Sequence, residues 1–313
     1  MDPLRYLCEQ RGYFTRAMAR EVGYDDKAVS LMVRKKHWHR FRRGYYCLTD
    51  IWKSLDPVSR HLVRCRAVLH SLGGERVALS HVSGLVAHGI DVWGYPLDRV
   101  HVTRLDGASS RLEGDVVHHR GASTSAEIVE LDGLRVFAPA RCAIEHGTRA
   151  TSESALVSFD AALRARRCTI EDLAAAFQRM GDWPGARHLH IPLRMADGAA
   201  ESVGESRGRW LFWSFGLPAP LLQYEVRDEN GDLRGICDWC WPERRTMGEF
   251  DGRSKYGRLL RPGIEPGDVV FAEKRREDEL RELTGMSMVR LVWEDYERPR
   301  ITAARLSRLL GAA

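Results

Sequence analysis

The residue types best suited to chemistry gather in one stretch, GICDWCWPERRTMGEFDGRSKY, at residues 235–256. It contains three carboxylates, Asp238, Glu249 and Asp251, and a Cys-x-x-Cys pair at positions 237 and 240. Hard divalent cations such as Mg²⁺ favour a few carboxylates together with water and substrate phosphate. A cysteine pair instead suggests zinc or redox chemistry. The two sets therefore indicate different chemistries, and the strand pattern around them separates the two.

The cysteine pair lies in a segment with a strand pattern. The expected strands cover residues 221–227, 233–241 and 246–250. Side chains alternate between the two faces of a strand, so Cys237 and Cys240 are expected on opposite sides of the sheet. No second cysteine pair follows them in the sequence. We therefore interpret both as small core residues rather than as a zinc or redox pair.

The carboxylates of the same strands favour a cation site. Asp238 lies in mid-strand among apolar neighbours, where an unpaired carboxylate is costly to bury. If this strand pairs with the next, Asp238 and Glu249 come within reach of one cation. The pattern predicts these two residues as ligands of Mg²⁺ or Mn²⁺. The alternative is a solvated strand edge, with ion pairs to Arg234, Arg244 or Arg245.

The elements that must position these carboxylates span residues 199–313. Glu201 and Glu205 begin a first helix, which a Gly-Leu-Pro sequence ends. Three strands follow, then a charged helix ended by Gly285, and then the apolar strand MSMVRLVWED. The order is αβββαβ, and we expect one C-terminal domain with this topology.

The basic residues concentrate at the other end of the chain. The net charge is only +5, yet residues 1–44 hold eleven Lys and Arg against five Asp and Glu. The remainder of the chain is therefore close to neutral. A local excess of this kind indicates a face that binds a polyanion.

Residues 1–50 have the pattern of a winged helix-turn-helix. Thr15 caps one helix and Asp25 caps the next. On a helical wheel, the second of these helices has an apolar side, opposite Lys27, Ser30 and Arg34. An apolar back and a polar, basic front are what a helix in the major groove requires.

The segment HRFRRGYYCL after that helix is expected to form the hairpin wing. It turns at Arg43-Gly44. Arg40, Arg42 and Arg43 would lie near phosphates, where positive charge gains by counterion release. The predicted DNA-binding residues are Lys27, Ser30, Arg34, Arg40, Arg42 and Arg43. The alternative is a charged three-helix module that binds only protein.

Residues 51–198 have the pattern of a mixed α/β connector domain. A short strand and then a helix are expected in ERVALSHVSGLVAHGI, strands in DRVHVTRL, GDVVHHRG and DGLRVFAPAR, and helices in the segments after them. Five histidines lie on different expected elements: His81, His88, His101, His118 and His119. Their spacing matches no metal or triad signature, so structural roles are favoured.

Composition sets further bounds on the class of protein. Seven cysteines scattered over the chain fit a reducing compartment better than a disulfide framework. No run of about 18 apolar residues occurs, which argues against a membrane-spanning helix. The sequence MDPLRYLCEQRGYF lacks a signal pattern, so we expect a cytoplasmic protein with no membrane association.

The C-terminal motifs resemble a known family. Glu205, GLPAP, Gln223, ICDWCWPE, GEFDG and the EKRREDEL segment are similar to the PD-(D/E)XK restriction-endonuclease-like fold. The closest variety is the branch related to very-short-patch-repair endonucleases, and the resemblance covers about residues 200–297. It implies that Asp238 and Glu249 are the metal ligands and that Glu205 contributes from the first helix.

This chain departs from the family at one position. Where the family has a lysine after the glutamate, the chain has Asp251, as in the E-x-D-G variant of this branch. Lys255 or Lys274 is then the candidate source of positive charge. The candidate catalytic residues are Glu205, Asp238, Glu249, Asp251 and Lys255.

The front of the chain resembles a second family. RRGYYCL, ALSHVSGLVAHGIDVWG, VHVT, VVHHRG and GLRVFAPARCAIEH are similar to actinobacterial proteins with an AbiEi-type antitoxin N-terminal region. The resemblance covers about residues 1–150. Such proteins are transcriptional autorepressors in type IV toxin–antitoxin and phage-abortive systems. It implies double-stranded DNA as a partner, and a cognate toxin protein as a second one.

Together these patterns predict an α/β (α+β multidomain) protein with domains at 1–50, 51–198 and 199–313. We expect a DNA-binding protein that delivers a metal-dependent endonuclease-like domain to DNA, in phage defence or a toxin–antitoxin context. The alternative is a repressor or antitoxin of AbiEi type whose nuclease-like domain is catalytically inactive. A third alternative is a protein-interaction scaffold without catalysis.

Overall fold

The computed structural model describes residues 2–121, 124–252 and 266–311. The chain divides into two compact units. Unit 1 comprises Met1–Ser158 and Arg167–Ile191, and unit 2 comprises Phe159–Arg166 and Pro192–Ala313. Both units combine helices with β-sheets, so the expected α/β fold class is confirmed. The expected domain boundaries after residues 50 and 198 stay predictions. Within the described residues, no helix is long and apolar enough to span a membrane.

Unit 1 begins with the expected winged helix-turn-helix. Its elements are α1 (Pro3–Arg11), β1 (Phe14–Thr15), α2 (Arg16–Glu21), α3 (Asp26–Arg34), β2 (Trp38–Arg42), β3 (Tyr45–Leu48) and α4 (Thr49–Ser54). Thr15 caps α2 by accepting from the amide of Met18 at 3.2 Å, and Asp25 caps α3 by accepting from Ala28 at 2.7 Å. The strands pair in the order β1-β3-β2. Gly44, with φ of 81°, makes the hairpin turn between β2 and β3.

An apolar cluster fixes the orientation of these elements. Phe14, Trp38 and Tyr46 are buried at its centre, and the rings of Phe14 and Trp38 meet edge to face with centroids 4.7 Å apart. From α3, Val29 enters the same cluster and is 1% exposed. Burial of this residue determines which side of α3 faces solvent.

The rest of unit 1 is built on a six-stranded mixed sheet. Its strands are β4 (Val77–Leu79), β5 (Val100–Arg104), β6 (Arg111–Glu113), β7 (Val116–His119), β8 (Ile128–Leu131) and β9 (Leu134–Phe137), in the order β6-β7-β5-β4-β9-β8. The expected strands are β4, β5, β7 and β9. The sequence analysis did not predict the two edge strands, β6 and β8. Both carry exposed side chains, and β6 is exposed throughout, so neither shows the apolar alternation of a half-buried strand.

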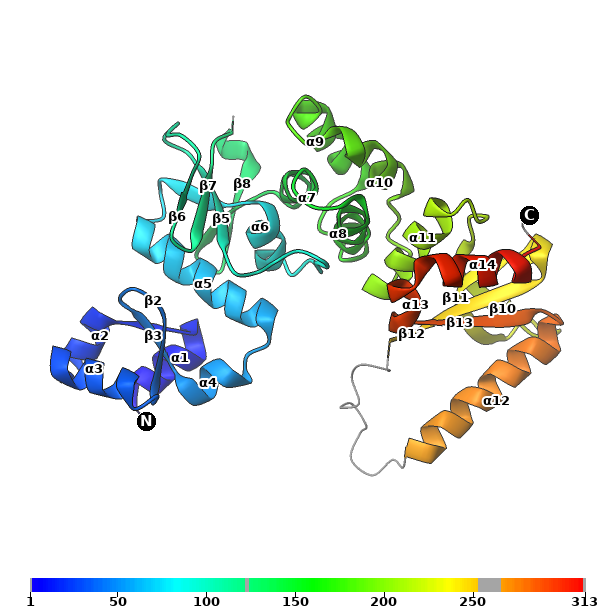
Figure 1. Ribbon diagram of the computed structural model, residues 1–313, viewed down its shortest axis with the longest axis horizontal. Helices are drawn as coiled ribbons and strands as arrows, with labels where there is room; N and C mark the ends of the chain where they lie inside the picture. Colours follow the sequence, from blue (N-terminus) through cyan, green and yellow to red (C-terminus); the bar gives the residue numbers. More distant parts are fainter. Residues whose placement is uncertain (1, 122–123, 253–265, 312–313) are drawn as a thin grey trace. The chain divides into compact units, whose positions relative to one another are not determined.

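The helices of this part form a layer beside the sheet and extend beyond it. Those that contact its strands are α5 (Pro57–Leu72) and α6 (His81–Ala87); α7 (Pro139–Gly147) packs on α6, and α9 (Ile170–Met180) packs on α7. The helices α8 (Ser152–Arg164) and α10 (His190–Met195) each continue into unit 2. Figure 1 shows α6 between α5 and α7, which it contacts. The approach of α6 and α7 depends on Gly84, because a Cβ there would lie 2.2 Å from Sγ of Cys142.

Unit 2 has the expected αβββαβ order. Its elements are α11 (Val203–Ser214), β10 (Leu221–Arg227), β11 (Leu233–Trp241), β12 (Thr246–Asp251), α12 (Pro266–Thr284), β13 (Ser287–Val292), α13 (Trp293–Glu297) and α14 (Pro299–Leu309). The sheet order is β10-β11-β12-β13. The first three strands are antiparallel, and β13 runs parallel to β12 because α12 crosses back between them.

Apolar clusters cover both faces of this sheet. On one face, α11, α13 and α14 pack against Trp239, Trp241 and Leu291. On the other, Leu280 of α12 packs against Met247. Figure 1 shows α13 and α14 on the side of the sheet opposite to α12.

The start of α11 is fixed by one close contact. A Cβ at Gly204 would lie 2.0 Å from the ring of Phe250 on β12, so only glycine allows the two to meet. The hydroxyl of Tyr296 also donates to the carbonyl oxygen of Gly204 at 2.6 Å. The next residue of α11, Glu205, is thereby held beside the sheet.

Candidate functional site

The helix α3 presents a polar and basic face to solvent. Val29 anchors its opposite side in the core. The three residues expected on the outer face, Lys27, Ser30 and Arg34, are all exposed. Ser30 Oγ donates to the main-chain oxygen of Asp26 at 2.8 Å. The wheel predicted from the sequence thus agrees with the observed burial, and the outer face has the side-chain types that contact base edges and phosphates.

Of the three arginines expected to contact DNA from the hairpin wing, two are exposed to solvent. Arg40 and Arg43 are exposed. Arg42 is half-buried and forms an ion pair with Asp115, on the turn between β6 and β7. The sequence analysis missed this pair because the partners lie 73 residues apart. Arg42 is therefore engaged within unit 1, whereas Arg40 and Arg43 face solvent.

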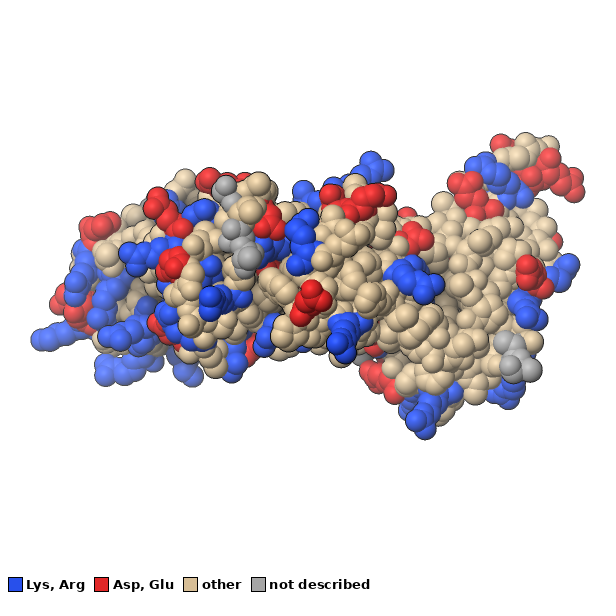
Figure 2. Space-filling view, turned by 90° about the horizontal axis from the view of Figure 1, so that it is seen from above, with Lys and Arg blue, Asp and Glu red and all other residues tan. Residues whose placement is uncertain are grey.

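Basic side chains are abundant over the surface of unit 1. Figure 2 shows Lys and Arg covering much of the face of this unit that is turned to the viewer. The exposed cations of the winged helix add to this charge; they include Lys27, Arg34, Lys35, Lys36, Arg40 and Arg43. A surface of this sign attracts the phosphates of a nucleic acid.

In unit 2 the structure brings two of the predicted catalytic carboxylates, Glu205 and Asp238, near enough for the charge of one to act on the other. Glu205 Oε2 accepts from Nε2 of Gln223 at 3.1 Å and from the amide of Glu201 at 2.8 Å. Asp238 Oδ2 accepts from the amide of Phe250 at 2.6 Å. Burial, followed by the negative charge of Glu205, raises the pKa of Asp238 to about 7. Burial also raises the pKa of Glu205 above its ordinary value.

Glu249 lies on the strand next to Asp238 but is engaged by arginines. The β11–β12 register pairs Trp239 with Gly248, so Asp238 and Glu249 occupy the adjoining positions. The charge of Glu249 also contributes to the raised pKa of Asp238, after burial and Glu205. Arg276 Nη2 lies 2.9 Å from Oε1 of Glu249, and Arg290 Nη2 lies 3.4 Å from Oε2. Ion pairing of Glu249 was the expected alternative, but its partners differ from the expected Arg234, Arg244 and Arg245.

The remaining predicted catalytic residues lie close by in sequence or outside the described ranges. Asp251 is the last residue of β12 and is half-buried. Lys255 lies outside the described residues, and its role stays a prediction. Within the described part of the chain, the carboxylates of unit 2 do not form a group of three whose oxygens all lie within 4.8 Å. The roles of Glu205, Asp238 and Glu249 as catalytic or metal-binding residues likewise stay predictions.

The prediction that Cys237 and Cys240 face opposite sides of the sheet is wrong. Both are buried in the apolar cluster under α12, where Cys237 Sγ lies 3.7 Å from Sδ of Met247. Trp239 lies in the apolar cluster on the other face, so the alternation of β11 is interrupted between Cys237 and Trp239, opposite the stretch of β10 where Gln223 has a φ of 48°. Burial raises the pKa of Cys237 to about 12 and that of Cys240 to about 11. Both thiols remain protonated at neutral pH, and their interpretation as core residues is confirmed.

Three of the five histidines noted in the sequence come together in unit 1. Nδ1 of His101 lies 3.0 Å from Nε2 of His119, and the ring of His81 stacks on that of His119 with centroids 3.7 Å apart. Burial lowers the pKa of His101 to about 2 and that of His119 to about 4, and it also lowers that of His81. All three imidazoles are therefore neutral at neutral pH, and each has one ring nitrogen that carries a lone pair.

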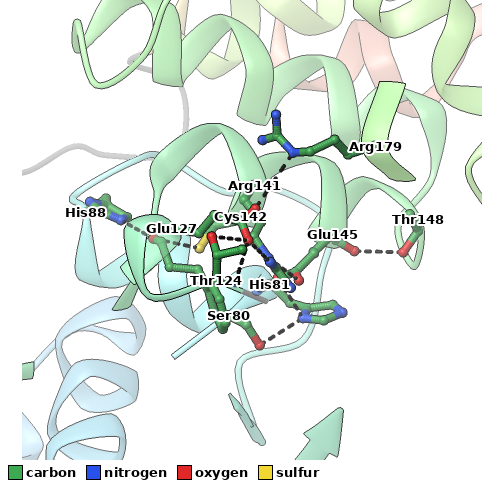
Figure 3. A network of polar contacts seen from close by, with 11 residues as sticks. Ser80, His81, His88, Thr124, Glu127, Arg141, Cys142, Glu145, Thr148 and Arg179 are labelled. Atoms are coloured by element: carbon green, nitrogen blue, oxygen red, sulfur yellow. Dashed lines mark hydrogen bonds and ion pairs between the residues drawn. The ribbon is translucent and has the colours of Figure 1, made fainter. Parts of the chain in front are cut away.

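A buried ion-pair network adjoins these histidines (Figure 3). Glu145 is fully buried; Arg141 donates from Nε to its Oε1 at 3.0 Å and from Nη1 to Glu127 Oε2 at 2.7 Å. Nδ1 of His81 lies 3.5 Å from Glu145 Oε2 and 3.0 Å from Oγ of Ser80. The sequence analysis missed this cluster because its members come from separate elements, so no local spacing reveals them.

Comparison with known proteins identifies relatives over about two thirds of the chain. Over 201 residues, 64% of this chain, the sequence is 31% identical to two proteins of Mycobacterium tuberculosis, "Uncharacterized protein MT2308" and "Uncharacterized protein Rv2248". The match covers 69% of each of those proteins. The chain belongs to their family.

Two further similarities concern parts of the fold. Residues 2–49 match the family described as "Transcriptional regulator, AbiEi antitoxin", which confirms the expected resemblance over the winged helix. The crystal structure of the RV2827C protein from Mycobacterium tuberculosis matches 71% of this chain and 87% of that chain, with 15% identity and a TM-score of 0.38. A TM-score this low does not establish a shared fold. The resemblance of unit 2 to the restriction-endonuclease-like fold stays a prediction.

Proposed function

We propose that this family member is a double-stranded DNA-binding regulator that reads an operator through α3 and holds the flanking phosphates with the β2–β3 hairpin. The observation that carries the proposal is the exposed face of α3, with Lys27, Ser30 and Arg34 opposite the buried Val29. The match of residues 2–49 to a transcriptional-regulator family supports it.

The geometry of the winged helix assigns different tasks to its exposed side chains. Lys27 and Arg34 lie seven positions apart on one side of α3, so both can face the groove that the helix enters. Arginine and lysine can contact guanine edges in the major groove, and serine can contact any base. Arg40 and Arg43 on the hairpin carry charge without sequence information, and they favour binding through counterion release.

The experiment compares two duplexes of equal length. One covers the DNA upstream of the gene that encodes this chain, and the other has the same composition in scrambled order. We expect tighter binding to the upstream DNA, and affinity that falls steeply between about 50 and about 200 mM salt. Equal affinity for the two duplexes would leave only non-specific binding, and absence of binding would contradict the proposal.

A toxin protein is the second partner that we propose. The support is the family description, which names an antitoxin. The test is co-expression of the tagged chain with the product of the neighbouring gene, followed by co-purification and a growth assay. Rescue of growth by the wild-type chain supports the partnership. A neighbouring product that is not toxic, or whose toxicity the chain does not relieve, contradicts it.

A second candidate function is metal-dependent cleavage of DNA by unit 2. The observation that favours it is a pair of carboxylates, the buried Glu205 and the half-buried Asp238, where the charge of Glu205 raises the pKa of Asp238. A carboxylate whose proton affinity is raised by a second carboxylate nearby is a common feature of sites that bind a cation. The αβββαβ order of unit 2 is consistent with the resemblance to restriction endonucleases.

In this candidate function, Asp238 and Glu249 would hold Mg²⁺ or Mn²⁺. Such an ion stabilises negative charge on the phosphate and lowers the pKa of a bound water. Glu205, held by Gln223 and by the amide of Glu201, is placed to accept a proton. Carboxylate oxygens are suitable ligands for either ion. Glu249 must, however, release its ion pairs with Arg276 and Arg290 before it can bind a cation.

Cleavage is tested with supercoiled plasmid, with linear duplex and with single-stranded DNA. Each is incubated with the full-length chain in Mg²⁺, in Mn²⁺ and in EDTA. Metal-dependent nicking that Asp238→Asn abolishes supports the nuclease function. Absence of cleavage with either metal, by a chain that binds DNA, favours the regulator with an inactive nuclease-like unit.

A further inference from the structure

Three histidines of unit 1 converge from elements that are far apart in the sequence. His81 begins α6, His101 lies in β5 and His119 ends β7. The parallel register of β5 and β7 pairs His101 with Val117 and Thr103 with His119, so the two histidines lie on one face of the sheet, two positions apart along the strands. One ring nitrogen from each histidine lies within 4.8 Å of the others. In ranges 2–121, 124–252 and 266–311, no other three His, Cys, Asp or Glu side chains are grouped this closely.

We propose that His81, His101 and His119 bind a divalent transition-metal ion of the zinc class, with a fourth position left for water or another ligand. Zinc binds imidazole nitrogen at about 2.0–2.1 Å, so tetrahedral ligand nitrogens lie about 3.3 Å apart. Nδ1 of His101 and Nε2 of His119 are already 3.0 Å apart. Shifts of about 1 Å or less per ligand atom bring all three to coordinating distance. The stacked rings of His81 and His119, 16° apart in plane, must also rotate so that the lone pair of each points at the ion.

The surroundings of His81 resemble the support of a zinc ligand. Its Nδ1 faces Glu145 Oε2 at 3.5 Å and Ser80 Oγ at 3.0 Å, which leaves Nε2 for the metal. Glu145 is in turn held by Arg141. A carboxylate on the second ring nitrogen orients a metal-binding imidazole and increases its basicity. Figure 3 shows His81, Glu145 and Arg141 joined in this way.

The backbone of His81 is a second, independent observation. Its φ is 51°, in the left-handed region that residues other than glycine rarely adopt. Such strain persists where the surrounding contacts require it, and it is concentrated at functional sites. The amide of His81 donates to Glu145 Oε2 at 3.4 Å, so the carboxylate that faces the ring also holds the strained backbone.

The ligand set also selects the kind of metal. Imidazole nitrogens suit Zn²⁺, Co²⁺, Ni²⁺ and Cu²⁺, whereas Mg²⁺ prefers oxygen ligands. His81 and His101 are 5% and 4% exposed, but His119 is only half-buried, so an ion can reach the cluster from that side. Three protein ligands with one open position are typical of zinc sites that bind water or a substrate. The proposal does not rest on DNA binding or on the carboxylates of unit 2.

The test uses the full-length chain, stripped with EDTA and fully reduced, and Co²⁺ as a spectroscopic probe for Zn²⁺. We expect one Co²⁺ per chain, a visible d–d absorption without a sulfur-to-cobalt band, and displacement by Zn²⁺. His101→Gln and His119→Gln should weaken binding by more than about 100-fold, because loss of a supporting residue alone costs about 10–100-fold. Glu145→Gln should give that smaller loss.

The matched control is His88→Gln. His88 is a buried histidine of the same unit whose Nε2 bonds the carbonyl oxygen of Phe137, away from the cluster, so its loss should leave Co²⁺ affinity unchanged. Circular dichroism and metal-free melting temperature report whether each variant folds. His119 is half-buried, so His119→Gln tests the site even if His101→Gln unfolds. No stoichiometric Co²⁺ or Zn²⁺ binding by the wild type, or binding unchanged in folded His119→Gln, would overturn the proposal and leave a hydrogen-bonded histidine cluster.

Discussion

The guanidinium of Arg42, on the hairpin wing, pairs with the carboxylate of Asp115 on the turn between β6 and β7. This contact joins the winged helix to the six-stranded sheet within unit 1. It also divides the wing's arginines into one that is engaged and two, Arg40 and Arg43, that face solvent. Equal contributions from all three to DNA binding are therefore not expected.

The first prediction follows from this division. Arg43→Ala should weaken binding to the upstream duplex and reduce the salt dependence by about one phosphate contact. Arg42→Ala should change affinity much less, because its charge is already compensated by Asp115. Fluorescence anisotropy across a salt series measures both. A larger effect of Arg42→Ala than of Arg43→Ala would show that the ion pair opens on binding.

The second prediction concerns the carboxylates of unit 2. Asp238→Asn and Glu249→Gln should each abolish Mn²⁺-dependent nicking, because each removes a proposed ligand charge. In EDTA, Asp238→Asn should not lower the melting temperature, since the amide oxygen of Asn can still accept from Phe250. The matched control is Asp228→Asn, in the exposed β10–β11 turn. Nicking that persists in folded Asp238→Asn would contradict the assignment.

A third prediction tests the packing that places Glu205. Gly204→Ala puts a methyl group 2.0 Å from the ring of Phe250, and overpacking of this kind costs about 1–3 kcal/mol. The start of α11 must shift, so any activity that depends on Glu205 should fall together with stability. Chemical denaturation measures the free energy of unfolding. Gly231→Asn is the control, because that glycine lies in an open turn with φ of 84°, which asparagine tolerates.

The fourth prediction concerns pH. Burial lowers the pKa of His61 to about 4, and its ring is held by the Leu97 carbonyl oxygen and the Ser83 hydroxyl. An unfolded chain takes up this proton near pH 6.5 and the folded chain only near pH 4, so unfolding becomes easier as the pH falls between these values. His61 alone lowers the free energy of unfolding by about 3 kcal/mol over this pH range.

Urea denaturation at about pH 7.5 and about pH 4.5 measures the effect of His61. His61→Gln should lower stability at the higher pH but make it depend less on pH. The exposed His37→Gln should leave the wild-type dependence intact. The same pH dependence in His61→Gln as in the wild type would assign the effect to other groups.

Local patterns predicted most of the secondary structure correctly. The caps at Thr15 and Asp25 and the turn at Gly44 follow from residue types that satisfy backbone groups or permit positive φ, so the winged helix could be drawn from its sequence. The αβββαβ order of unit 2 was likewise predictable, because apolar alternation and helix ends are local signals.

Contacts between distant elements were not predictable from the sequence. The face of Cys237 depends on a break in the alternation of β11, and the ion pair of Arg42 depends on a turn of another sheet. The three histidines of the proposed metal site come together only because β4, β5 and β7 lie side by side in one sheet and α6 begins directly after β4. To predict such contacts, one must know which strands pair and in what register, and a single sequence does not provide this.

The most direct test of DNA reading by α3 is the salt dependence of binding to the upstream duplex by the wild type and by Lys27→Ala/Arg34→Ala. The matched control is Arg227→Ala, an exposed arginine of unit 2 paired with Glu225. We predict that the double variant binds more weakly and that its slope of log affinity against log salt is shallower by about two, while the control is unchanged. An unchanged slope and affinity in the folded double variant would contradict the account.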